Sequence, residues 1–351
     1  MTEVKAGPVP YIYVCTRMRV RKSKLIPREE YLRMLNMGLS EITRFVEETQ
    51  YKKEIDELAT AFHGIDLIEI ALSWNLAKEY QNIQKITPGT LKDLTRAYLR
   101  RWDIQNILTI IRGKLHGERP GKIKEVLVPA GELDKAFLDR MIEEPSPERI
   151  IESLKGKAGY PLLSRLFEGG VREELLPKAE NELYKQFYAD LIEMARSGIK
   201  GGRQFLDYLT LDIDITNIRN MFRFRADQSG DDIMNVAIPG GTISPQMMQR
   251  LLQIKDRNEF IDALVPLIKT RVLRELLETL REEKSIREIE IDLIKVQIAE
   301  METMSKLHPF SIHPILAYLE MKKYEIFNLR ALARGKESNL SPDRIRGYLV
   351  I

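Results

Sequence analysis

The stretch Asp103-Ile-Gln-Asn106-Ile-Leu-Thr-Ile-Ile-Arg112 occurs twice more in the chain, in altered form. The second copy is Asp214-Ile-Thr-Asn217-Ile-Arg-Asn-Met-Phe-Arg223, and the third is Glu325-Ile-Phe-Asn328-Leu-Arg-Ala-Leu-Ala-Arg334. Each copy begins 111 residues after the one before it. Three copies of one pattern at a fixed spacing indicate a repeated structural unit.

The acid of each copy belongs to an apolar stripe if the stretch is helical. At 3.6 residues per turn it shares a quarter of the circumference with the residues one, four and eight positions later, which are Ile104, Ile107 and Ile111 in the first copy. A carboxylate placed there has to be paired or hydrogen-bonded, because burying it alone is costly. The arginine lies half a turn out of phase. We therefore expect the acids to fix each helix to one neighbour and the arginines to fix it to another.

Helical periodicity extends along the whole chain, and no segment shows a convincing strand alternation. Long helices are predicted over about 27–48, 65–78, 90–113, 171–196, 202–225, 282–304 and 312–334. Gly113 and Gly335 are predicted to end two of them. A serine followed by a proline is a typical helix start, and it occurs at 146–147, 244–245 and 341–342. Thr90 and Asp93 resemble a capping box.

Proline-containing segments also repeat between the helices. The segment Val126-Leu-Val-Pro129-Ala-Gly-Glu-Leu133 is paralleled by Val236-Ala-Ile-Pro239-Gly-Gly-Thr-Ile243 and by Leu25-Ile26-Pro27. The sequence therefore predicts an all-α protein of three homologous helical units, at 11–122, 123–232 and 233–351, the last with a short C-terminal helix. Such a body can close around a pseudo-three-fold axis and form a concavity.

The composition excludes several classes of protein. Apolar residues make up 44% of the 351 residues and charged residues 30%, which suits a soluble body with sizeable cores. The net charge of +3 is too small to indicate nucleic-acid binding. Cys15 is the single cysteine, so an internal disulfide is excluded. No signal peptide and no membrane-spanning run is predicted. Gly-Lys pairs at 113–114, 121–122 and 335–336 lack the rest of a Walker A sequence, so no direct ATP binding is expected.

With this repeat, the chain resembles the C subunits of the archaeal-type (A/V-type) rotary ATP synthases, which are the counterparts of the d subunits of eukaryotic vacuolar ATPases. The last unit carries the strongest likeness, in His308-Pro-Phe-Ser-Ile312, Tyr318-Leu319, Lys323, Glu325 to Arg330 and Arg334-Gly-Lys336. The opening Tyr13-Val-Cys-Thr-Arg17-Met-Arg19-Val-Arg21 resembles the start of the family. The likeness covers about Tyr11 to Val350.

The resemblance implies a non-catalytic part of a motor. Members of that family are pseudo-three-fold, funnel-shaped helical proteins that sit on the cytoplasmic face of the membrane rotor ring, which is built of proteolipid subunits. They receive the foot of the central shaft formed by the D and F subunits, and so transmit torque between ion translocation and ATP synthesis or hydrolysis. Catalysis resides in the A and B subunits, so neither a cofactor nor a transmembrane segment is expected here.

The sequence offers candidate structural and contact residues but no catalytic, cofactor-binding or metal-binding residue. The structural candidates are the acid, asparagine and arginine of each copy: Asp103, Asn106, Arg112, Asp214, Asn217, Arg223, Glu325, Asn328 and Arg334. Arg21, Lys22 and Lys24 are candidates for contacting a partner, since they are expected to be more exposed than Arg17 and Arg19, which could serve the acids. His308 and His313 suggest a metal site only weakly, because no cysteine or acid lies at ligand spacing.

Three other functions remain open from the sequence alone. A helical-repeat scaffold with a different partner is the main alternative, although open solenoids usually have shorter units. Nucleic-acid binding is suggested only by the basic N-terminal stretch, and a metal-using hydrolase has little support among the residues present.

Overall fold

The computed structural model describes residues 9–227 and 233–351, and every regular element in those ranges is a helix. The predicted all-α fold is therefore confirmed. The described residues form two compact bodies. Those of body I lie within Met1–Ile42, Ile86–Leu94 and Leu191–Ile351, and body II comprises Thr43–Lys85 and Thr95–Asp190. The first copy of the repeat lies in body II and the other two in body I, while the boundaries of three units near 122 and 232 remain a prediction.

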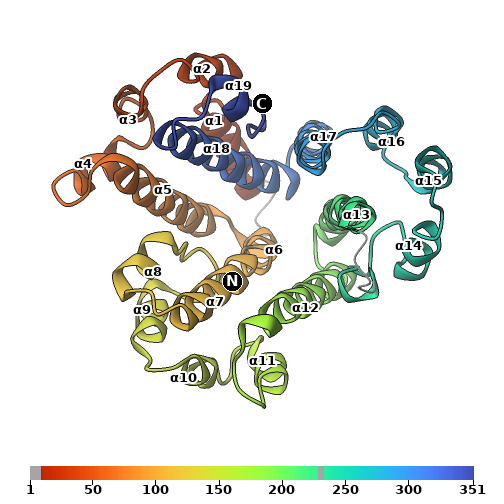
Figure 1. The fold of residues 1–351 in the computed structure, drawn as a ribbon, viewed down its shortest axis with the longest axis horizontal. Coiled ribbons are helices and arrows are strands. Elements are labelled where there is room, and N and C mark those ends of the chain that lie inside the picture. The colour runs from red at the N-terminus through yellow and green to blue at the C-terminus, as the bar shows by residue number, and fades with distance from the viewer. Residues whose placement is uncertain (1–8, 228–232) are drawn as a thin grey trace, which may run out of the picture. The chain divides into compact units, whose positions relative to one another are not determined.

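Body I is built around two long helices that carry the second and third copies of the repeat. Helix α18 packs against α1, α17 and α19, and α17 packs in turn against α13 (Figure 1). The elements that lie wholly in body I are α1 (Val9–Lys22), α2 (Arg28–Met34), α13 (Gly202–Asp227), η2 (Ile233–Asn235), α14 (Pro245–Leu251), α15 (Arg257–Leu264), η3 (Val265–Leu267), α16 (Arg271–Thr279), α17 (Ile286–Leu307), α18 (His313–Glu337) and α19 (Pro342–Arg346).

Body II surrounds the helix of the first copy. Helix α7 packs against α8, α9 and α10 (Figure 1). The elements wholly in this body are α4 (Lys52–Leu58), α7 (Arg101–Leu115), α8 (Pro120–Val126), α9 (Lys135–Glu143), α10 (Pro147–Ser153), α11 (Tyr160–Leu166) and η1 (Glu173–Leu175). Four helices contribute residues to both bodies: α3 (Leu39–Glu47), α5 (Gly64–Ile86), α6 (Gly89–Leu99) and α12 (Leu176–Arg196).

The predicted serine caps are confirmed at three helix starts. Ser146 accepts a hydrogen bond from the N–H of Arg149, and Ser244 accepts one from the N–H of Met247. Ser341 caps α19 in the same way. In each case proline is the first helical residue, where its missing N–H costs nothing. Local sequence therefore decides where these helices begin.

Two of the predicted long helices are interrupted. The segment 27–48 divides into α2 and α3, because residues 35–38 form turns and the Glu41 carboxylate accepts a hydrogen bond from the N–H of Gly38. The segment 90–113 divides into α6 and α7 at Arg100. Helix α6 begins at Gly89, and the Thr90 hydroxyl bonds the hydroxyl of Tyr11, so Thr90 is not the predicted cap.

The prediction that Gly113 and Gly335 end their helices is wrong. Helices α7 and α18 continue past these glycines and end near Gly117 and Asn339, which have φ angles of 68° and 54°. The glycines serve a different purpose. A Cβ at Gly113 would lie 2.7 Å from the side chain of Ile123, on α8, and one at Gly335 would lie 2.6 Å from Ile345, on α19. Their missing side chains allow the next helix to pack closely.

We predict that Gly113→Ala destabilises the protein, although alanine normally stabilises a helix interior by about 0.5–1 kcal/mol relative to glycine. Because the new methyl group overlaps Ile123, we expect a loss of about 1–3 kcal/mol in the free energy of unfolding. Urea denaturation measures it. Gly121→Ala is the matched control, since a Cβ there meets no atom within 4 Å. A Gly113→Ala protein as stable as the wild type would contradict the close packing.

Candidate functional site

The asparagine of every copy forms the same pair of hydrogen bonds with a backbone segment that follows it. Asn106 donates from Nδ2 to the Val128 carbonyl oxygen at 2.8 Å, and its Oδ1 accepts from the Val128 N–H at 3.0 Å. Asn217 binds Ile238 at 2.8 and 2.9 Å, and Asn328 binds Val350 at 2.9 and 2.8 Å. All three asparagines are buried. Each amide thus satisfies a backbone donor and acceptor that would otherwise be buried without partners.

The acids bind backbone N–H groups of the same segments. Asp103 accepts from the N–H groups of Glu132 and Leu133, at 2.8 and 3.0 Å. Asp214 accepts from both the N–H and the hydroxyl of Thr242, at 2.6 and 2.5 Å. These amides lie just before the N-cap residues of α9 and α14. The acid and the asparagine of one helix therefore hold both ends of one loop, and we call this arrangement the clasp.

The two loops contain a glycine where the acid approaches. A Cβ at Gly131 would lie 2.2 Å from Oδ1 of Asp103, and one at Gly241 would lie 2.4 Å from Oδ1 of Asp214. Any other residue would displace the carboxylate. In body II the loop is also held from its other side, because Gln81 and Gln84 on α5 donate to the carbonyl oxygens of Pro129 and Ala130, both at 2.8 Å.

In the third clasp the loop comes from two distant parts of the chain. Asn328 binds Val350, but Glu325 accepts from the N–H of Ile26, 299 residues away, at 2.6 Å. Ile26 precedes Pro27, the N-cap of α2, as Leu133 precedes Asp134. The segment Leu25-Ile26-Pro27 therefore corresponds to the part of the other loops that binds the acid, as its predicted parallel implied. The part that binds the asparagine is supplied by Val350 instead.

A buried lysine supports the acid of the third clasp. Lys322 is 0% exposed, and its Nζ donates to Oε1 of Glu325 at 2.9 Å, while Oε2 of the same carboxylate accepts from Ile26. In the other clasps the printed donors to the acid come from one continuous loop. In the third, an ammonium group from the same helix is one of the donors, and its charge compensates a carboxylate that is itself buried. Because glutamate is longer than aspartate by one methylene group, it reaches a segment contributed from elsewhere in the sequence.

All three motif arginines are exposed. Arg112 lies 4.0 Å from Glu180 on α12, and Arg223 forms an ion pair with Glu290 on α17. Such exposed pairs contribute little to stability. Arg112 and Arg334 lie in the last turns of their helices, where a cation interacts favourably with the helix dipole. In the first two copies the arginine lies near a helix that does not carry the loop bound by the acid, and the aspartates bind backbone amides rather than cations.

Burial raises the pKa values of two of the acids. The pKa of Asp103 rises from 3.8 to about 6 because burial of the carboxyl outweighs the opposing effect of the Glu132 and Leu133 N–H donors. Burial also raises the pKa of Asp214, against the hydrogen bonds from Thr242. These carboxyl groups are therefore closer to their protonated forms than exposed aspartates are.

The exposure of the basic side chains of α1 differs from what the sequence predicted. Arg17 and Arg19 are exposed, whereas Arg21 and Lys22 are half-buried, so the predicted ranking of exposure is wrong for these four. Lys22 forms an ion pair with Glu302, while Lys24 is exposed. Arg19 donates to the carbonyl oxygen of Pro309 at 3.3 Å.

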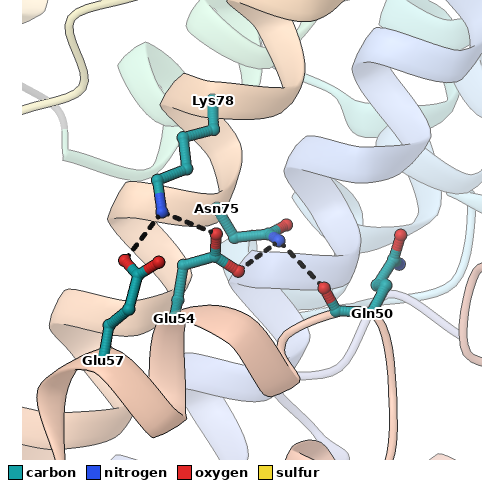
Figure 2. A network of polar contacts seen from close by, with 5 residues as sticks. All are labelled: Gln50, Glu54, Glu57, Asn75 and Lys78. Carbon is teal, nitrogen blue, oxygen red and sulfur yellow. Dashed lines mark hydrogen bonds and ion pairs between the residues drawn. The ribbon is translucent and has the colours of Figure 1, made fainter.

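A further polar cluster joins α4 to α5 in body II. Figure 2 shows Asn75 and Lys78 of α5 turned toward Glu54, a buried carboxylate on α4. Asn75 donates to Glu54 at 2.9 Å and to the carbonyl oxygen of Gln50 at 3.1 Å, and Lys78 lies 3.0 Å from both Glu54 and Glu57. The cluster neutralises a buried charge and fixes the two helices together.

The histidine pair offers no metal geometry. His313 is buried and its Nε2 lies 2.8 Å from the carbonyl oxygen of Gln204, and burial lowers its pKa. Among the residues that the structure describes, no group of three His, Cys, Asp or Glu side chains is placed to hold a metal ion.

Sequence reasoning found the acids and asparagines but missed the backbone that they bind. Val128, Ile238 and Val350 follow their asparagines by 22, 21 and 22 residues. That near-constant interval is a signal the sequence contained, because two of these residues precede the repeated prolines.

We predict that Asn217→Ala lowers the free energy of unfolding by about 2–4 kcal/mol, because both the N–H and the carbonyl group of Ile238 lose their buried partner. Urea denaturation tests this. Asn82→Ala provides the control, since Asn82 is exposed near the C-terminal end of α5 and alanine favours a helix. Equal stability of the two variants would mean that the clasp contributes nothing.

A second prediction concerns pH. The folded protein binds the Asp103 proton more tightly than the unfolded chain does, because the pKa is about 6 against 3.8. The stabilising contribution of this group is therefore complete below about pH 3.8 and is lost as the pH rises through about 6. The free energy of unfolding of the wild type and of Asp103→Asn can be measured between about pH 3.5 and about 7.5, roughly every half unit. The wild type should lose stability relative to Asp103→Asn as the pH rises across this range. A pH-independent difference would contradict the raised pKa.

No helix in the described ranges is both long and apolar enough to cross a membrane. The family model described as "ATP synthase (C/AC39) subunit" matches residues 14–348. Curated relatives that are C subunits of A-type ATP synthases include one from Methanosarcina acetivorans, 38% identical over 99% of this chain and 94% of the relative, and one from Archaeoglobus fulgidus, 35% identical over 99% and 98%. A third, from Haloferax volcanii, is 33% identical over 97% of both chains. The matched family model and these full-length relatives show that this chain belongs to the ATP synthase (C/AC39) subunit family.

Proposed function

We propose that this protein is a non-catalytic central-stalk subunit of an A-type ATP synthase, seating the shaft of the D and F subunits on the membrane rotor ring. Its place is the cytoplasmic side of the membrane, and its task is to transmit torque between ion translocation and ATP synthesis or hydrolysis. Family membership over nearly the full chain is the observation that carries this proposal. The arrangement of three helical units around a pseudo-three-fold axis belongs to the same proposal.

The internal contacts support a mechanical task. A part that passes torque by contact has to resist bending between the surfaces that contact its partners. Each clasp fixes a loop to a long helix through buried hydrogen bonds, which break only with the loss of several buried partners at once. The acids and asparagines of the repeat supply this internal support, and in the proposal ATP chemistry belongs to the A and B subunits.

The proposal predicts a specific uncoupling when the chain is removed. In a host lacking its gene, membranes should still hydrolyse ATP through the catalytic head, but hydrolysis should no longer drive ion uptake. A tagged wild-type chain, supplied in trans, should restore uptake and should co-purify in mild detergent with the ring proteolipid, D, F, A and B. Normal ion pumping without the chain would overturn the coupling role.

The main alternative is a helical scaffold for a different partner. It predicts that the tagged chain co-purifies with other proteins and leaves the ATP synthase subunits behind. ATP hydrolysis by the isolated chain would also contradict the proposal.

A further inference from the structure

Most of the exposed large apolar side chains described in body I belong to two segments of the chain. In the described residues, seven large apolar side chains are exposed, and five of them belong to α1, to the last residue of α17 or to the turn that follows it. These are Ile12, Tyr13, Val20, Leu307 and Phe310, with exposed fractions between 42% and 69%. Such clustering distinguishes them from scattered surface residues, which need no explanation.

The two segments are joined directly. Cys15 of α1 lies 3.5 Å from the carbonyl oxygen of Ser311, and Arg19 donates to that of Pro309. Tyr13, Arg17 and Val20 follow one another at helical intervals of four and three, so they share one face of α1. Arg19 lies about 160° around the helix from Arg17, at the other edge of the exposed half of α1 and next to Phe310. We define the α1 patch as Tyr13, Arg17, Arg19, Val20, Leu307 and Phe310, which follow the exposed half of α1 and the adjoining end of α17 and turn.

The charge of this patch is positive. Helix α1 contains no acidic residue, and Arg17 and Arg19 are both exposed. Lys306 beside Leu307 is exposed as well. Glu302, one turn back on α17, is neutralised by its ion pair with Lys22. A surface that approaches the patch therefore meets cations whose charge is not cancelled within the patch.

Each of the two arginines lies close to an aromatic ring. The guanidinium carbon of Arg17 lies 5.8 Å from the ring centre of Tyr13, and that of Arg19 lies 5.7 Å from the ring centre of Phe310. Contacts of this kind hold a long side chain in place and so reduce the entropy lost on binding. Each guanidinium group keeps donors for a carboxylate, which it can bind with two hydrogen bonds.

We infer that the α1 patch is a docking surface for a carboxylate-bearing, apolar segment of another protein chain. The inference rests on the proposed function, because that partner would be a subunit of the ATP synthase. Tyrosine, phenylalanine, arginine and aliphatic residues together are typical of protein interfaces. An anionic lipid surface would be expected to attract mainly a cluster of lysines and arginines with weak geometric demands, and ordered arginine–aromatic pairs favour the protein partner.

Two binding assays test the role of the Arg17 and Arg19 charges. Purified full-length chain is bound to membranes from the gene-deleted host and, separately, to a purified D–F complex. The variant R17E/R19E should bind at least about tenfold more weakly to one of these two probes. The control R250E/R274E changes the net charge equally, at exposed arginines on α14 and α16, and should bind as the wild type does. Urea denaturation verifies that each variant is folded.

The apolar part is tested in the same assay. Phe310→Ser should weaken binding to the same probe about tenfold, as truncation of an aromatic anchor does. Phe327→Ser is its control, because Phe327 has a similar exposed fraction, 45% against 49%, but lies outside the patch. A p-benzoylphenylalanine at position 13 should crosslink to a segment of the partner that contains Asp or Glu among apolar residues.

The outcomes separate the two proposals. Wild-type binding that R17E/R19E and Phe310→Ser leave unchanged would overturn the docking surface while the proposed function stands. Failure of the wild-type chain to bind either probe would overturn the proposed function itself. Equal binding of the wild-type chain to phosphatidylglycerol vesicles and to ring-containing membranes would assign the patch to lipid and overturn the protein partner.

Discussion

The reciprocal pair of hydrogen bonds between a buried asparagine and one backbone residue is the interaction on which this structure depends. An amide side chain offers a donor and an acceptor in one plane, as a peptide group does, so it continues the hydrogen bonding of a chain that has no strand partner. Asn106, Asn217 and Asn328 each do this for a loop packed on a long helix. Without that pairing, a loop could not be buried in an all-helical body.

The sequence predicted this organisation well where local rules apply. Ser146, Ser244 and Ser341 cap helices because a serine before a proline satisfies N–H groups within three residues of itself. The spacing of the repeat also singled out the three acids that accept hydrogen bonds from backbone N–H groups. These features depend on neighbours in sequence or on periodicity, and both can be read without coordinates.

The features that the sequence did not predict depend on contacts between residues far apart in the chain. The sequence suggests that Gly113 ends a helix, yet it lies inside α7. A glycine suits that position because the side chain of Ile123 packs into the space that a Cβ would occupy. Each motif asparagine binds main-chain groups, so the side chain of the residue that supplies them carries no sign of the contact, and only the spacing to the repeated prolines does. Arg17 and Arg19 alternate with apolar residues, but the helix turns both arginines outward. Which face of α1 is covered was decided by α18, far along the chain.

The third clasp has a consequence for the order of folding. The first two close within 21 to 30 residues, whereas Glu325 and Ile26 are 299 residues apart. Bringing the more distant ends together costs about 2 kcal/mol more in chain entropy, if the intervening chain is still flexible. The two local clasps should therefore form early, and the distant one late, when much of the intervening chain has already condensed. Body I would then acquire its final rigidity in a last, slow kinetic step.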